Sequence, residues 1–64
     1  MENRVRDLRL KRGMTIRQLH EITGISPSYI HYIETGRKVP SVYHAQRLAN
    51  AFKTTVEFLF PQNG

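Results

Sequence analysis

The sequence predicts an all-α fold, a compact bundle of five helices that fills one domain over residues 1–64. Apolar residues recur at helical spacings of three and four, as in the segment 45–52, and no stretch shows the alternation of a strand. Helix stop signals divide the first half, where Gly13, Gly24 and Gly36 each follow a stretch of helical spacing. These two observations together predict short helices joined by tight turns.

Helix start signals place the five helices at residues 2–12, 16–23, 27–35, 42–52 and 55–60. Thr15 with Gln18 has the spacing of a capping box, and so has the segment 54–57. Ser26 before a proline, and Ser41, are capping residues for the third and fourth helices. The expected core contains the apolar residues at helical spacing, namely Val5, Leu8, Leu19, Ile22, Ile30, Ile33, Ala45, Leu48, Ala49, Phe52, Val56, Leu59 and Phe60.

The composition limits the class of protein. The 64 residues include ten Lys and Arg against five Asp and Glu, a net charge of +5, and no cysteine. The absence of cysteine excludes disulfides and thiolate metal sites, and the short chain leaves no room for a catalytic domain beside its core. The basic balance favours a polyanionic partner. No apolar run reaches the roughly 18 residues of a membrane span, and no signal peptide is evident, so we expect a cytoplasmic location.

No catalytic or cofactor-binding pattern is present. His20, His31 and His44 are 11 and 13 residues apart, which matches no zinc-binding spacing. Gly36-Arg37-Lys38 lacks the spacing of a P-loop, and no nucleophile is paired with a base. We therefore expect no enzymatic activity, no metal, no cofactor and no small-molecule ligand.

The second and third helices are separated by only three or four residues around Gly24. This connection length is typical of a helix-turn-helix, here at residues 16–35, whose second helix enters the major groove of DNA. The segments Leu19–Ser26 (LHEITGIS) and Tyr29–Ser41 (YIHYIETGRKVPS) resemble the phage lambda repressor/Cro-like, or Xre-type, helix-turn-helix family. The resemblance extends from about Arg4 to Phe60.

The resemblance implies a five-helix lambda-repressor-like fold and binding to double-stranded operator DNA, usually as a homodimer on a pseudo-palindromic site. It matches Ser28 and Tyr32 to base-reading positions and Pro27 to the groove entrance. The expected base contacts are Pro27, Ser28, His31 and Tyr32. The expected backbone contacts are Ile16, Arg17, Gln18, Ser26, Tyr29, Arg37, Lys38 and Ser41.

The sequence departs from the family pattern at two positions. The family often has Gln at the first residue of the second helix, where it braces the DNA backbone, and this chain has Ile16. The family prefers a small residue where the second helix packs on the third, and this chain has His20. We expect His20 either to pack against the third helix or to tilt outward and open the angle between the helices.

Two further roles concern structure and assembly. By resemblance, Arg9 pairs with Glu34 in a partly buried ion pair that fixes the register of the first and third helices. Tyr43, Phe58 and Phe60 are candidates for a dimer surface, since an exposed ring on so small a domain indicates an interface. Packing of these rings against the fourth helix explains them equally well.

The leading functional hypothesis is a sequence-specific DNA-binding transcriptional regulator that acts as a repressor. The alternative is a protein-interaction module, such as an antitoxin or regulatory partner, that keeps the fold with weak or no DNA binding. Ile16 and the apolar surface from Tyr29 to Tyr32 favour this alternative. Salt dependence separates the two, because DNA binding driven by phosphate contacts weakens steeply as salt rises.

Overall fold

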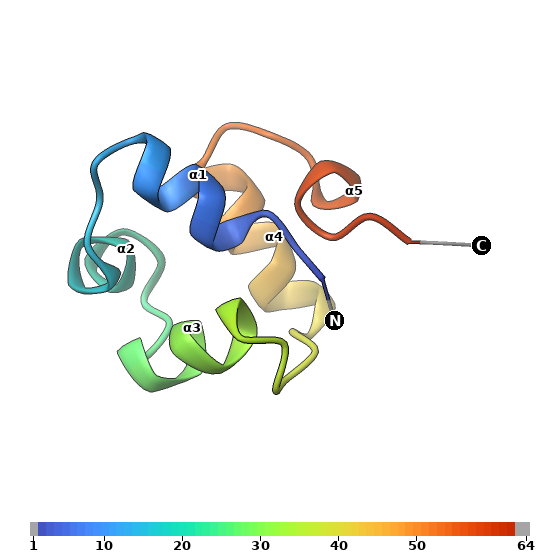
Figure 1. Cartoon of the computed structure of the whole chain (residues 1–64), viewed down its shortest axis with the longest axis horizontal. Helices are drawn as coiled ribbons and strands as arrows, with labels where there is room; N and C mark the ends of the chain where they lie inside the picture. The colour runs from blue at the N-terminus through green and yellow to red at the C-terminus, as the bar shows by residue number, and fades with distance from the viewer. Residues whose placement is uncertain (1, 63–64) are drawn as a thin grey trace.

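Five α-helices form the fold, in the order α1 (Val5–Lys11), α2 (Ile16–Thr23), α3 (Pro27–Glu34), α4 (Val42–Ala51) and α5 (Val56–Leu59). The computed structural model describes residues 2–62, and this part of the chain contains no strand, which confirms the predicted all-α class. α4 packs against α2 and α5, while α1 packs against α3 (Figure 1). Within residues 2–62 every helix is too short or too polar to cross a lipid bilayer.

The core draws on all five helices and on the turn before α3. Its buried apolar residues are Val5, Leu19, Ile25, Ile30, Ile33, Ala45, Leu48, Ala49, Phe52, Leu59 and Phe60. Leu8, Met14, Ile16, Tyr29, Ala51 and Val56 pack around it in partly buried positions. Because a 64-residue chain buries a limited apolar area, this core is supplemented by capped helix ends and by one buried ion pair.

The expectation that Ile22 belongs to the core is wrong. Its side chain is 60% exposed, and the next residue, Thr23, is buried in its place. The Thr23 hydroxyl donates to the Leu19 carbonyl at 2.8 Å and accepts from the Ile25 amide at 3.2 Å. Thr23 can therefore be buried at the end of α2 without leaving a polar group unsatisfied.

Three helices, α2, α3 and α4, start at the predicted residues, and each start is fixed by a side-chain cap. Thr15 and Gln18 form the complete capping box of α2, and Ser26 and Ser41 cap α3 and α4. The predicted box at 54–57 is wrong by one residue, because Thr55 caps α5 by accepting from the Phe58 amide at 3.1 Å.

α1 starts at Val5, three residues later than predicted. Asn3 Oδ1 accepts a hydrogen bond from the Val5 amide at 3.1 Å. The Arg4 amide donates at 2.9 Å to the carbonyl of Leu59 in α5. The residues before α1 are therefore bound to the other end of the chain, and they do not extend the helix.

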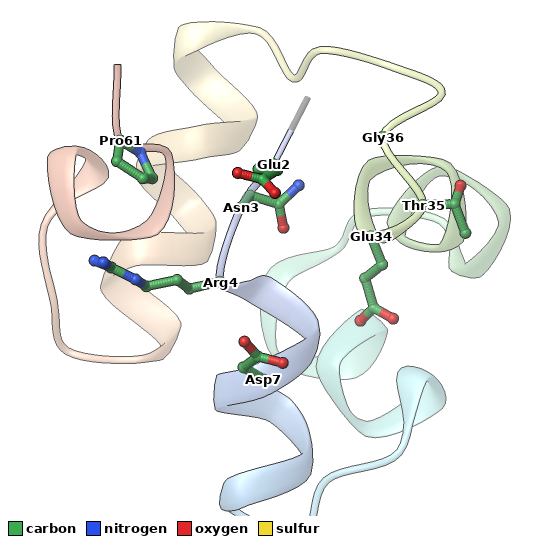
Figure 2. A pocket seen from close by; sticks show the side chains of 8 residues that line it. All are labelled: Glu2, Asn3, Arg4, Asp7, Glu34, Thr35, Gly36 and Pro61. Atoms are coloured by element: carbon green, nitrogen blue, oxygen red, sulfur yellow. The ribbon is translucent and has the colours of Figure 1, made fainter. Parts of the chain in front are cut away.

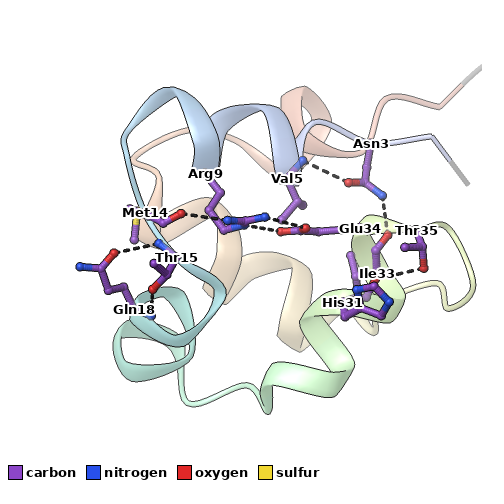
Figure 3. A network of polar contacts seen from close by, with 10 residues as sticks. All are labelled: Asn3, Val5, Arg9, Met14, Thr15, Gln18, His31, Ile33, Glu34 and Thr35. Carbon is purple, nitrogen blue, oxygen red and sulfur yellow. Dashed lines mark hydrogen bonds and ion pairs between the residues drawn. The ribbon is translucent and has the colours of Figure 1, made fainter.

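The ion pair expected between Arg9 and Glu34 joins α1 to the end of α3 (Figure 3). Arg9 Nε and Nη2 donate to the two carboxylate oxygens of Glu34 at 2.7 and 3.1 Å. Arg9 Nη1 also donates to the Met14 carbonyl at 2.9 Å, which ties in the loop before α2. Hydrogen bonding to Glu34 raises the pKa of Arg9 above its ordinary value, although burial opposes this shift. The pair thus positions α3 relative to α1 and α2.

Candidate nucleic-acid interface

The turn between α2 and α3 holds the two helices of the motif at a fixed angle. Gly24 ends α2 in the left-handed conformation with φ 76°, and its amide donates to the His20 carbonyl at 2.7 Å. The His20 ring, half-buried, lies 2.8 Å through Nδ1 from the carbonyl of Ile25. The His20 ring is thus directed to the turn between α2 and α3. Of the two orientations expected from the sequence, this is not the outward tilt into solvent.

α3 presents one exposed face beside a buried one. Ile30 and Ile33 are completely buried and fix the helix against the core. The four predicted base-reading residues are all exposed: Pro27, Ser28, His31 and Tyr32. The N-terminus of α3 is well defined, since Ser26 accepts from the Tyr29 amide at 3.1 Å and Pro27 occupies the first turn. The structure therefore brings these four residues together on one face of α3.

A hollow joins this face of α3 to the loop that follows it. It is lined by Ser26, Ser28, Tyr29, Tyr32 and Lys38. The loop is held in place because the amides of Arg37 and Lys38 both donate to the Tyr32 carbonyl, at 2.9 and 3.2 Å. Lys38 thus supplies a cation beside hydroxyl groups at the edge of α3, a combination suited to a phosphate next to the bases.

The first turn of α4 completes this side of the interface. Ser41 Oγ accepts from the His44 amide at 3.2 Å and lies 2.8 Å from His44 Nδ1. The His44 ring meets the edge of the Tyr29 ring, with centroids 4.7 Å apart. Sequence reasoning treated His44 only as a possible metal ligand. Its position four residues before the buried Leu48 and three residues after the capping Ser41 is the signal that could have placed it in the first turn of α4.

The remaining backbone candidates lie at the start of α2. Arg17 and Gln18 are exposed, whereas Ile16 is partly buried against the core. Gln18 Oε1 accepts from the Thr15 amide at 2.8 Å, so this side chain is engaged in the capping box (Figure 3). The start of α2 therefore offers one exposed cation, Arg17, and the backbone amides of a capped helix N-terminus.

Acidic side chains gather at a different place. A polar hollow between the start of α1, the end of α3 and Pro61 has the carboxylates of Glu2, Asp7 and Glu34 around it (Figure 2). None of the four base-reading candidates lines it. Arg4 also lines this hollow, and Glu34 is paired with Arg9. The two remaining carboxylates, Glu2 and Asp7, lie outside α3, where they do not oppose a polyanion on its exposed face.

The three aromatic candidates for a dimer surface have different environments. Phe60 is only 5% exposed and belongs to the core, so its assignment to a surface is wrong. Phe58 is partly covered by the Arg4 guanidinium, which lies 4.3 Å from the ring centre. Tyr43 is exposed on α4, with the Arg47 guanidinium 4.5 Å from its ring and hydrogen-bonded to its hydroxyl. Of the three rings, Tyr43 and Phe58 are therefore the exposed ones.

Comparison with known sequences agrees with this geometry. The family model described as helix-turn-helix matches residues 5–59. A protein of Archaeoglobus fulgidus, described as an uncharacterized HTH-type transcriptional regulator, is 35% identical over 60 residues, which cover 94% of this chain and 86% of that protein. The Bacillus subtilis regulator YgzD, described in the same words, is 33% identical over 60 residues, covering 94% and 91%.

Two solved structures are similar in fold. The chain superposes on one in the SinR–SinI protein complex with a TM-score of 0.84 at 23% identity, covering 92% of this chain and 58% of that one. The clp gene regulator ClgR of Corynebacterium glutamicum gives a TM-score of 0.75 at 33% identity, covering 81% and 55%. This chain spans a little over half the length of either structure. Taken with the sequence matches, the chain belongs to the helix-turn-helix family of DNA-binding transcription regulators, in its lambda repressor/Cro-like branch.

Proposed function

We propose that α3 docks in the major groove of an operator and that the protein acts there as a repressor. The observation that carries this proposal is the exposed face of α3, where Pro27, Ser28, His31 and Tyr32 lie opposite two completely buried isoleucines. A helix held this firmly by the core presents side chains to base edges with little loss of conformational freedom. Bound across a promoter, the domain excludes the transcription machinery.

The side chains on this face set the kind of recognition. Ser28 and His31 can hydrogen-bond to base edges, and Pro27 and Tyr32 can contact a thymine methyl group. Arg, Asn and Gln, which make the strong bidentate base contacts, are absent from α3. We therefore propose modest direct discrimination per domain, supplemented by water-mediated contacts and by the shape of the DNA.

Phosphate contacts surround this face. Arg17 lies at the start of α2, Arg37 and Lys38 lie in the loop after α3, and Ser41 begins α4. Ile16, Gln18, Ser26 and Tyr29 complete the proposed set, the first two through the α2 N-terminus. His44 joins them because its ring packs on Tyr29 and its Nδ1 meets Ser41. These contacts supply affinity that depends little on sequence and strongly on salt.

We propose that two copies bind a pseudo-palindromic site. The α3 of one copy lacks the side chains that make strong base contacts, and this supports the arrangement. A second half-site adds its own sequence discrimination, and binding of the first copy raises the effective concentration of the second. Access to chromosomal DNA is needed for this function, and this need supports the cytoplasmic location expected from the sequence.

Selection of bound sites from a random duplex pool tests the proposal. The expected result is a pseudo-palindrome whose half-sites are centred about one helical turn apart. Binding to the selected site should fall with a log–log salt slope near −0.9 per phosphate contacted. Failure to enrich any duplex at about 50 mM salt would overturn DNA recognition and favour the protein-interaction alternative.

A further inference from the structure

The His44 ring has a fixed position in the first turn of α4, where two tyrosine rings flank it. Its centre lies 4.7 Å from that of Tyr29 in α3, at an interplanar angle of 76°, and 5.8 Å from that of Tyr43, at 74°. His44 Nδ1 lies 2.8 Å from the hydroxyl oxygen of Ser41. The ring is half-buried, and within residues 2–62 its other nitrogen, Nε2, has no hydrogen-bond partner.

The Ser41 hydroxyl lies between two nitrogen atoms of the same histidine. Its oxygen accepts a hydrogen bond from the His44 amide at 3.2 Å, and this bond is the cap of α4. When the imidazole is neutral and carries its proton on Nε2, the hydroxyl donates its one hydrogen to Nδ1. Ser41 then has no donor left for another molecule.

A proton on the ring reverses the bond between the two side chains. Imidazolium carries a hydrogen on both nitrogens, so Nδ1 donates to the Ser41 oxygen, which has a second lone pair and still accepts from the His44 amide. The hydroxyl hydrogen of Ser41 is thereby released and can turn to an outside acceptor. A protonated His44 thus adds a positive charge and two free donors, Nε2–H and the Ser41 hydroxyl, without loss of the helix cap.

The groups around His44 supply no negative charge for a protonated ring. The phenols of Tyr29 and Tyr43 face it, and the Arg47 guanidinium, one turn further along α4, hydrogen-bonds to the Tyr43 hydroxyl. On the side of α3, Lys38 shares a hollow with Tyr29. Among residues 2–62 no carboxylate bonds to His44. The counter-anion therefore has to come from another molecule, and the N-terminal end of the α4 dipole also attracts one.

We propose that His44 and Ser41 form a proton-dependent phosphate site, so that binding of the operator takes up a proton at His44. This inference rests on the proposed function, which puts a DNA phosphate at the start of α4. Nε2–H and the released Ser41 hydroxyl donate to phosphate oxygens, whose charge stabilises the imidazolium. Because the complex holds more protons than the separate molecules, affinity should rise as the pH falls through about 8 to 5, where imidazole titrates.

The other two histidines lack this coupling to a capping hydroxyl. The His20 ring lies at the end of α2, where Nδ1 meets the carbonyl of Ile25. His31 is exposed on α3, and its ring lies beside that of Tyr32. Since His31 is also a candidate for a DNA contact, it is the matched control for a histidine in the same interface.

Calorimetry of operator binding, repeated in buffers of different ionisation enthalpy, measures the proton uptake directly. For the wild type we expect about half a proton per copy near pH 7, and an affinity about tenfold higher at pH 5.5 than at pH 8. In His44→Gln the side chain does not titrate, and Gln three residues after Ser41 keeps the capping-box spacing that starts α4. The uptake should vanish in His44→Gln and persist in His31→Gln. Uptake that persists in His44→Gln, or that is lost in His31→Gln, would overturn the proposed site.

The salt dependence gives a second readout, which a purely structural role of His44 would not change with pH. For each bound copy, the log–log salt slope of the wild type should be steeper at pH 5.5 than at pH 8 by about 0.9, the value for one phosphate contact. His44→Gln should have the same slope at both pH values. Equal slopes in the wild type would refute the proton-dependent site while DNA recognition stands. Wild-type protein that binds no duplex at either pH would refute the proposed function itself.

Discussion

Arg9 of α1 and Glu34 at the end of α3 form a bidentate ion pair in which both side chains are largely buried. Two guanidinium nitrogens reach the two carboxylate oxygens, at 2.7 and 3.1 Å, and a third donates to the Met14 carbonyl. Two charges removed from water contribute little net stability unless their geometry is this complete. The main consequence is positional, since the pair fixes the recognition helix against α1.

Glu34→Ala should lower the free energy of unfolding by about 3–5 kcal/mol, because it leaves the Arg9 guanidinium buried without its counter-charge. Urea unfolding monitored by circular dichroism measures the loss. The double variant Arg9→Met with Glu34→Leu should recover most of the stability, since apolar residues of similar volume can replace a buried pair. A double variant as unstable as the single one would show that the pair itself stabilises the fold.

Gly24→Ala should be more destabilising than Gly13→Ala. Both glycines have positive φ, 76° and 65°, so each alanine is strained by about 1–2 kcal/mol. A Cβ at Gly24 would lie 3.1 Å from Arg47 Nη1, whereas the space around Gly13 is open. Displacing Arg47 weakens its 2.7 Å hydrogen bond to the Thr23 carbonyl, which adds about 1 kcal/mol.

Thermal or urea unfolding of the two alanine variants measures this difference. The Arg47→Met background is the control, because the extra loss at Gly24 should disappear once the guanidinium is absent. If the difference persists in that background, contact with Arg47 is not its cause.

His20→Ala should lower stability by about 1 kcal/mol, since it removes the ring that hydrogen-bonds to the Ile25 carbonyl at 2.8 Å. A carbonyl oxygen only accepts, so Nδ1 carries the proton when the ring is neutral. Nitrogen-15 NMR of the imidazole should therefore show the Nδ1–H tautomer. His31→Ala is the comparison, because that ring is exposed on α3 and its loss should leave stability within about 0.5 kcal/mol.

Short-range chemistry made much of this fold predictable. Thr15, Ser26 and Ser41 each cap a helix through a residue three positions later, so sequence alone is enough to locate α2, α3 and α4. The start of α1 combines a local bond from the Val5 amide to Asn3 with a bond from the Arg4 amide to Leu59, a partner near the other end of the chain. No local pattern contains the information for the bond to Leu59.

The errors at single residues have a similar cause. Ile22 and Thr23 are adjacent at the end of α2, and helical spacing alone does not decide which of them faces inward. The outcome depends on whether the Thr23 hydroxyl finds partners, which it does in Leu19 and Ile25. The exposure of Pro27, Ser28, His31 and Tyr32 was easier to predict, because the apolar pair Ile30 and Ile33 fixes the buried face of α3 and leaves the opposite face to solvent.

The interface assignments make a prediction that separates affinity from specificity. Arg37→Ala should weaken binding to every duplex and reduce the magnitude of the salt slope by about 0.9, the amount expected for one lost phosphate contact. Ser28→Ala should instead change the preference at one base position by about 1–3 kcal/mol and leave the salt slope unchanged. Lys11→Ala removes the same charge as Arg37→Ala from an exposed site on α1, and it should leave the slope near that of the wild type. Titrations of a panel of operator variants at several salt concentrations measure all three effects. An equal loss of affinity for every operator in Ser28→Ala would mean that Ser28 contacts the DNA backbone. The base contacts of α3 would then be assigned to His31 and Tyr32 without Ser28.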